Sequence, residues 1–258
     1  MALAQGISVK AHDLGARGLK YDRLWMVVDE DGNFVTQCTV PRMCLIAPSL
    51  PSSDHEPLEL TAPGMTSISV PVLGRKSGAE TKTVTVWGLP CEAQDQGNSV
   101  AEWLSSFLQT PGLRLVRMAD SFRRPTHPEY AQGHETAFTD GFPLVLISEE
   151  SLLDLNARLE RRKREPVPME QFRPNIVVQG CNPFAEDTWQ DLQLGGQRMS
   201  VVKPCSRCKI STTNQDTGTQ APEPLETLRT YRTGAALQKP KKEWKEEVLA
   251  TSITLRLP

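Results

Sequence analysis

The sequence has no long apolar run, no glycine-rich phosphate loop and no internal repeat, and each absence excludes a class of protein. No segment approaches the roughly 20 consecutive apolar residues of a membrane-spanning helix. Neither a Walker A sequence nor a G-x-G-x-x-G turn occurs, so a nucleotide held by a glycine loop is not indicated. No segment recurs at a period of about 20–50 residues, which argues against solenoids and propellers.

The chain also lacks a large excess of positive or negative charge. The 258 residues carry 29 Lys and Arg against 31 Asp and Glu, a net charge of -2, so no nucleic-acid surface is indicated. Hydrophobic residues make up 38% and charged residues 23%, as in a soluble globular protein of one large or two small domains. The N-terminal stretch matches neither a secretory signal nor a clear transit peptide.

The first third of the chain predicts strands and turns. Residues 22–36 hold an apolar run, an Asp-Gly turn at Asp31 and a second apolar segment, which predicts a hairpin. Short strands are predicted at 58–73 and 82–88, the second with the alternation of a half-buried strand.

Two helices are predicted. In residues 97–109 apolar side chains recur at helical spacing, and Asn98 or Ser99 can cap the first turn. In residues 148–164 Ser148 is the expected cap, acidic residues follow it, and the basic run RRKR ends the segment. We interpret that run as a solvated helix end rather than a nucleic-acid patch. Further strands are predicted at 142–147, 172–180, 197–204 and 252–257.

The six cysteines are Cys38, Cys44, Cys91, Cys181, Cys205 and Cys208. Spread over a chain without a signal peptide, they indicate a reducing compartment rather than a disulfide framework. Cys44, Cys91 and Cys181 are expected to be small buried hydrophobic residues.

Cys205 and Cys208 form a single C-x-x-C motif, CSRC, which leaves several kinds of site open. Structural zinc needs four ligands, and here it would have to recruit Cys181 and a distant histidine. A thioredoxin-like pair opens a helix, whereas residues 209–218 are β-branched and turn-forming. A cysteine nucleophile with a distant histidine stays open. The other interpretation is one thiolate bound to a soft metal centre, with Arg207 favouring the ionised sulfur.

Two arginines precede predicted strands in contexts that suit an anionic cofactor. Arg23 lies in YDRLW, and Arg173 and Asn175 flank the proline of FRPN. A guanidinium pairs with phosphate through two parallel hydrogen bonds, and an asparagine amide offers both a donor and an acceptor. For each arginine taken singly, a structural ion pair is the stronger interpretation.

Three stretches resemble a known family. GLKYDRLWMVVDEDGNFVTQ is similar to the opening of the N-terminal β-barrel-like domain that accompanies MOSC domains. FTDGFPLVLISEESLLDLNARL and the long run from FRPN through CSRC to TYR resemble the MOSC domain of the mitochondrial amidoxime-reducing components and their plant and bacterial relatives. The resemblance covers about residues 6–232.

The resemblance implies a strand-rich α+β fold, with a MOSC-type β-barrel, an N-terminal β-barrel-like subdomain and a few flanking helices. We predict the N-terminal domain at 1–114, without its first strand, and the MOSC domain at 118–258. Residues 232–258 match no part of the family pattern and are expected to form an atypical tail.

The resemblance also implies a molybdenum cofactor, a molybdopterin phosphate that carries the metal. Cys208 is then the molybdenum ligand and the catalytic residue, and Cys205 is not a ligand. The implied cofactor contacts are Arg23, Thr139, Asp140, Gly141, Arg173, Asn175, Ser206, Arg207 and Cys208. The implied reaction is the two-electron reduction of N-hydroxylated compounds: amidoximes, hydroxylamines and N-hydroxylated bases.

The family further implies a separate electron donor, either a cytochrome b5 with its NADH-dependent reductase or an iron–sulfur partner. It implies the mitochondrial outer membrane, although we expect no anchor in this chain, which would otherwise be cytosolic. At the level of the domain family it also carries an association with pyridoxal phosphate.

Three departures from the family pattern lead to further expectations. Lys10 aligns poorly with the lysine of the family's first strand, so that role is not transferred to it. Cys38 stands where the family has an arginine. Because the chain matches the pattern at neither end, we expect an incomplete product with reduced cofactor retention. The alternatives are a carrier related to molybdenum cofactor sulfurase, whose fused pyridoxal-phosphate domain is not present here, and a truncated, inactive interaction protein.

Overall fold

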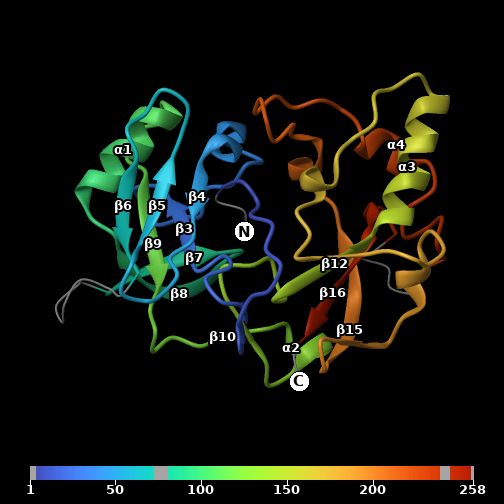
Figure 1. The fold of residues 1–258 in the computed structure, drawn as a ribbon, viewed down its shortest axis with the longest axis horizontal. Coiled ribbons are helices and arrows are strands. Elements are labelled where there is room, and N and C mark those ends of the chain that lie inside the picture. Colours follow the sequence, from blue (N-terminus) through green and yellow to red (C-terminus); the bar gives the residue numbers. More distant parts are fainter. Residues whose placement is uncertain (1–3, 73–80, 239–244, 257–258) are drawn as a thin grey trace. The chain divides into compact units, whose positions relative to one another are not determined.

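The computed structural model describes residues 4–72, 81–238 and 245–256, which form two compact units (Figure 1). Unit 1 comprises Met1–Arg124, Glu135–Asp140 and Gln215–Gly218, and unit 2 comprises Pro125–His134, Gly141–Asn214 and Thr219–Pro258. Each unit therefore takes in short segments from beyond its main stretch of sequence. The domain limits at 114 and 118 stay a prediction.

Unit 1 is built mainly of antiparallel sheets. One has the strand order β3 (Trp25–Val28), β9 (Arg114–Met118), β8 (Leu89–Asp95) and β7 (Thr81–Val86). A second has the order β4 (Ala47–Ser49), β5 (Pro57–Thr61) and β6 (Ile68–Pro71). A small pair joins β1 (Leu14–Gly15) and β2 (Gly18–Leu19), and the 3-10 helix η1 spans Pro41–Leu45.

The predicted hairpin at 22–36 is confirmed in its turn but not in its second strand. The Asp29 carboxylate accepts hydrogen bonds from the N–H groups of Asp31 and Asn33, at 3.0 and 2.8 Å. Gly32 has φ +80°, a conformation that glycine adopts without steric cost. After the turn, Phe34 pairs with Val28 only through an isolated bridge.

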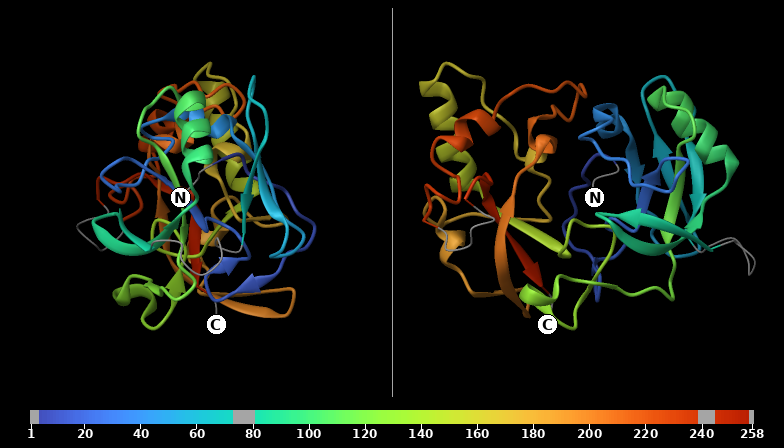
Figure 2. Two further views of the ribbon diagram at one scale, coloured as in Figure 1. Left: turned by 90° about the vertical axis from the view of Figure 1, so that its left-hand side faces the viewer. Right: turned by 180° about the vertical axis from the view of Figure 1, so that it is seen from behind.

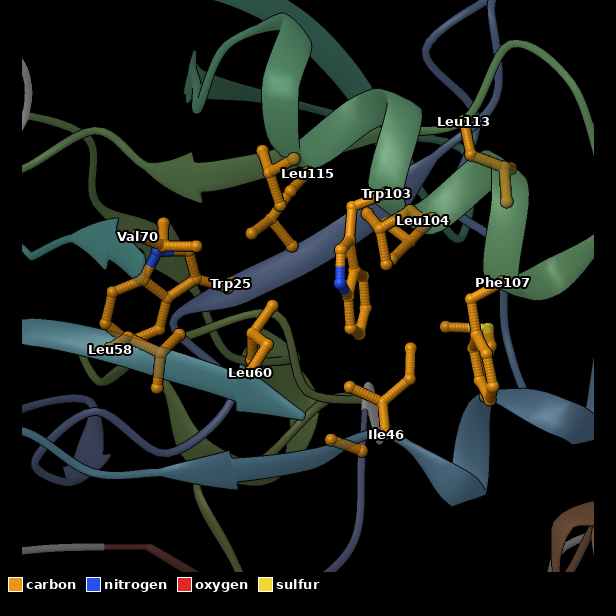
Figure 3. Close-up of a cluster of buried hydrophobic side chains, with 14 of the residues drawn as sticks. Trp25, Ile46, Leu58, Leu60, Val70, Trp103, Leu104, Phe107, Leu113 and Leu115 are labelled. Carbon is orange, nitrogen blue, oxygen red and sulfur yellow. The ribbon is translucent and has the colours of Figure 1, made fainter. Parts of the chain in front are cut away.

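Helix α1 (Asn98–Leu108) confirms the predicted apolar stripe. Figure 3 shows its Trp103, Leu104 and Phe107 in one cluster of buried side chains with residues from β3 and β5. The predicted cap is wrong, because the helix begins after Gly97 and no side chain caps it. Asn98 accepts a hydrogen bond from the Arg114 guanidinium instead, at 3.1 Å.

Unit 2 contains a five-stranded mixed sheet, which Figure 2 shows from two further sides. Its strand order is β13 (Ile176–Val178), β12 (Leu144–Ser148), β16 (Leu249–Arg256), β15 (Gln197–Ser206) and β14 (Asp191–Leu194). β13 runs parallel to β12, and the other pairs are antiparallel. The expected atypical tail therefore supplies the central strand. Most of its charge run, at 239–244, lies outside the described residues.

Short helices and one longer helix complete unit 2. They are α2 (Pro128–Ala131), α3 (Glu149–Arg161), η2 (Met169–Phe172), η3 (Ala185–Thr188), η4 (Lys209–Thr212) and α4 (Leu225–Arg229).

Ser148 caps α3 by accepting the N–H of Ser151 at 3.1 Å, as predicted. The RRKR run at 161–164 is exposed, which confirms a solvated helix end. A further two-stranded pair joins β10 (Arg124–Pro125) and β11 (Glu135–Thr136), and all of its residues except Pro125 belong to unit 1. The strand-rich α+β prediction is confirmed. No described helix is long and apolar enough to cross a membrane.

Tyr231 gives the stability of the protein a pH dependence. Its ring lies 3.9 Å from the Arg158 guanidinium, and burial raises the pKa of the phenol to about 12. An unfolded tyrosine ionises near pH 10, so above that pH only the unfolded state loses the proton. The contribution of Tyr231 to stability is therefore present below about pH 10 and is lost as pH rises toward about 12. Urea unfolding across this range should show the fall, and Tyr231→Phe should flatten it; an equal fall in the variant would contradict this.

Candidate functional site

Cys208 is the most exposed of the six cysteines. It follows β15 in extended backbone, and it is exposed, whereas the other five cysteines are buried or half-buried. Its carbonyl accepts hydrogen bonds from the Ser211 N–H at 3.2 Å and from the Ser211 hydroxyl at 3.0 Å. The first turn of η4 therefore fixes the Cys208 backbone while the residue stays exposed.

The other cysteines are less suited to a thiolate role. Cys44 and Cys91 are buried, as predicted, and burial raises the pKa of the Cys91 thiol. Cys181 is only half-buried, so that prediction is wrong: its thiol lies 3.6 Å from a carboxylate oxygen of Glu150. Burial is the main cause that raises the pKa of the Cys181 thiol. A raised pKa disfavours the ionised sulfur that binds metals.

Arg207 joins the CSRC motif to the segment that ends at Phe172. Its guanidinium donates to the Cys205 sulfur at 3.2 Å and, through a second nitrogen, to the Phe172 carbonyl. The guanidinium also lies 5.2 Å from the Phe172 ring centre, and the Arg207 N–H donates to the Val248 carbonyl at 2.9 Å. Arg207 therefore orders the motif through protein contacts. Its contact with a cofactor stays a prediction, as does that of the exposed Ser206.

Residues 173–175 follow directly after Phe172 in the chain. The hydrogen bond from Arg207 to the Phe172 carbonyl therefore connects Arg173 and Asn175 to the CSRC motif within unit 2. Asn175 pairs with Val145 of β12 twice: its N–H donates to the Val145 carbonyl at 2.8 Å, and its Oδ1 accepts the Val145 N–H at 3.1 Å. The Asn175 Oδ1, which was expected to accept a hydrogen bond from the edge of a cofactor heterocycle, is therefore already bonded to β12. We call Arg173, Asn175, Ser206, Arg207 and Cys208 the Cys208 cluster.

Three predicted residues lie in unit 1, and Gly141 is the first residue of the following unit 2 segment. Arg23 forms an ion pair with its neighbour Asp22, and its carbonyl accepts the N–H of Phe138 at 3.0 Å. This bond brings Arg23 beside the segment that carries Thr139 and Asp140. Thr139 is buried and Asp140 is exposed.

Two of the three predicted cofactor arginines have left-handed backbone. Arg23 has φ +51° and Arg173 has φ +53°, a region that residues other than glycine rarely occupy. Such strain gathers at functional sites because surrounding contacts hold it in place. Neither position is a glycine, so the residue types did not indicate this backbone conformation.

The strain at Arg173 allows its role in binding to be separated from its role in folding. Arg173→Gly removes the side chain and relieves the left-handed backbone, so the unfolding free energy should stay within about 1 kcal/mol of the wild type. Retention of an anionic cofactor should fall. The matched control is Gln109→Gly at the end of α1, where φ is +54°. Chemical unfolding and cofactor content of both variants test this; equal retention in both would contradict the role of Arg173.

The zinc alternative finds no support in the described residues, which hold no group of three or more His, Cys, Asp or Glu placed to bind a metal ion. The Cys208 cluster instead offers one exposed cysteine directly after Arg207, and a second arginine, Arg173, that follows the Phe172 carbonyl bound by Arg207. A single thiolate suits a soft metal, and guanidinium groups suit a phosphate. These donors fit a metal carried by an anionic organic cofactor.

Comparisons with known proteins agree with this reading. The family model described as MOSC N-terminal beta barrel domain matches residues 4–111, and that described as MOSC domain matches residues 133–251. Mitochondrial amidoxime reducing component 2 of Rattus norvegicus is 41% identical over 239 residues, covering 88% of this chain and 68% of that protein. The Bos taurus component 2 and the Homo sapiens component 1 are each 36% identical, with the same two coverages.

One solved structure, a solution structure of a Bordetella bronchiseptica protein, is also similar. It shares 20% sequence identity and a TM-score of 0.34, covering 48% of this chain and 92% of that chain. Such a score supports no argument about the fold or the site.

Proposed function

Because the chain belongs to the mitochondrial amidoxime-reducing component family of MOSC proteins, we propose that it is a molybdenum-cofactor-dependent reductase of N-hydroxylated compounds. The observation that carries the proposal is the exposure of Cys208 alone among the six cysteines, at the end of a strand whose loop Arg207 fixes. An accessible thiolate on a rigid support is what a metal ligand requires.

Each predicted site residue has a role in the proposed reductase. Cys208 holds the metal, and Arg173 and Arg23 bind the anionic groups of the cofactor. Ser206, Asn175, Thr139, Asp140 and Gly141 supply further polar contacts to it. Arg207 is a further cofactor contact, and its bonds to Cys205 and Phe172 connect the Cys208 loop with the Arg173 segment. When bound, the cofactor supplies the two-electron redox chemistry. The overall reaction breaks the N–O bond with two electrons and two protons and releases water.

The electrons come from a separate donor, for which we propose a cytochrome b5 with its NADH-dependent reductase, or an iron–sulfur protein. We also propose a mitochondrial location at the outer membrane, on the strength of relatives that are named mitochondrial.

The test is a reconstituted assay. The full chain, purified from a host that makes the cofactor, is combined with NADH, cytochrome b5, its reductase and benzamidoxime. Benzamidine should form in an amount equal to the NADH consumed, and omission of either electron carrier should stop it. A chain that retains molybdenum and forms no benzamidine with either class of donor would contradict a reductase and favour a carrier.

A further inference from the structure

A buried arginine outside the predicted site, Arg124, donates hydrogen bonds to the segment that carries Thr139 and Asp140. We call Ala137, Phe138, Thr139 and Asp140 the Thr139 segment; all four belong to unit 1. Arg124, also in unit 1, lies in the short strand β10 beside β11, and the Thr139 segment follows directly after β11. The short β10–β11 pair therefore places Arg124 next to the start of the segment.

Arg124 bonds to the segment at two alternate residues. It is 3% exposed, and its Nη1 donates to the carbonyl of Ala137 at 2.8 Å and to that of Thr139 at 2.6 Å. One nitrogen thus holds both carbonyls, on either side of Phe138. The buried Nε–H has no hydrogen-bond partner among the described residues.

The charge of Arg124 is not balanced by a buried ion pair. Among the described residues no carboxylate lies within salt-bridge distance of it. Burial lowers the pKa of the guanidinium, and Cys91 and then Asp140 act in the opposite direction. A buried cation without an ion-pair partner is costly for folding alone. Such a cost is commonly found where a side chain serves a functional site.

The segment is held at each of its inner residues. Phe138 is fully buried, and its N–H donates to the Arg23 carbonyl at 3.0 Å. The Thr139 hydroxyl lies 2.7 Å from that of Thr136, and both are buried. Only Asp140, at the end of the segment, is exposed. The buried contacts thus fix the backbone that presents Asp140 at the surface.

We propose that Arg124 is a positioning residue for cofactor binding: it holds the Thr139 segment so that Thr139 and Asp140 meet the cofactor. The inference rests on the proposed function, which gives Thr139 and Asp140 that role. Arg124 acts through the backbone of the segment and touches no reacting atom.

The control is Arg117, a second buried arginine of unit 1. It is 5% exposed, and its Nε–H is likewise buried without a partner among the described residues. Arg117 lies in β9 and pairs with Asp120 at 2.9 Å rather than with the Thr139 segment. Arg117→Gln therefore disturbs the fold of the same unit by a similar change.

The experiment measures hydrogen exchange of the cofactor-free chain and molybdenum retention of the loaded chain. In Arg124→Gln the amides of residues 136–140 should exchange at least about tenfold faster, because two charge-assisted hydrogen bonds are lost. The affinity for the cofactor, followed as molybdenum retained per chain, should fall by about 10–100-fold. Arg117→Gln should change neither. Arg124→Lys keeps the charge and a donor, so it should recover part of both signals and remains informative if Arg124→Gln does not fold.

Unchanged exchange at 136–140 in both Arg124 variants would overturn the proposal. Faster exchange with unchanged molybdenum retention would also overturn it, because the Arg124 hydrogen bonds would then stabilise the fold without affecting cofactor binding. A wild-type chain that takes up no molybdenum would contradict the proposed function itself, and it would overturn the cofactor part of this proposal with it.

Discussion

Cys208→Ser is expected to abolish benzamidoxime reduction. Removing an outer-shell partner of a metal site typically costs about 10–100-fold in affinity or activity, so loss of the ligand itself should cost at least about 100-fold. Serine is close to isosteric and Cys208 is exposed, so the stability of the chain should not change. Activity is measured per bound molybdenum, which separates a lost reaction from lost cofactor.

Two cysteine variants serve as controls. Cys181→Ser changes a half-buried thiol that lies near Glu150, and it should keep full activity. Cys205→Ser keeps an acceptor for the Arg207 guanidinium, and its activity should fall far less than that of Cys208→Ser. If Cys208→Ser matched these controls in activity per molybdenum, the assignment of the ligand would be wrong.

Arg232→Leu is expected to destabilise unit 2 more than any surface change. Arg232 is 3% exposed and pairs with Asp187 through two nitrogens, at 2.7 and 2.9 Å. Its Nε also donates to the Leu249 carbonyl of the central strand β16 at 3.2 Å. Removing one partner of a buried pair leaves the other charge uncompensated, which costs about 3–5 kcal/mol. Urea unfolding should report a loss of this size.

The exposed pair of Arg198 and Asp191 provides the contrast. Their closest atoms are 3.3 Å apart, and the Arg198 side chain is 78% exposed. Arg198→Leu should change the unfolding free energy by less than about 1 kcal/mol. Equal losses for the two arginines would show that burial does not set the strength of the Arg232 pair.

The predictable parts of the fold depend on local patterns. The apolar stripe of α1 and the Ser148 cap of α3 both follow from residues within one or two turns of each other. The cap of α1 could not be predicted, because the Asn98 side chain is engaged by Arg114, sixteen residues away. The central place of β16 depends on pairing with β12 and β15, which lie far off in the sequence.

The candidate site likewise has features that local sequence patterns predict and features that only the folded chain creates. The C-x-x-C spacing indicated Cys205 and Cys208 together, and only the family resemblance assigned the ligand role to Cys208, which is exposed in the structure. The contact of Arg207 with Phe172 arises only when η2 and the CSRC loop meet in the fold, whereas its contact with Cys205 is local. Arg124 carried no sequence signal, since nothing in a motif marks an arginine that bonds two backbone carbonyls.

Comparing turnover with molybdenum content tests most directly whether the chain is a molybdenum-dependent reductase. Preparations of the full chain from cultures with graded molybdate are assayed for benzamidoxime reduction with an NADH-driven donor. If Cys208 holds the metal that reduces the substrate, turnover should rise in proportion to molybdenum per chain and reach zero where molybdenum does, while Cys208→Ser stays near zero throughout. Turnover that is independent of molybdenum, or a Cys208→Ser line that overlies the wild type, would contradict it.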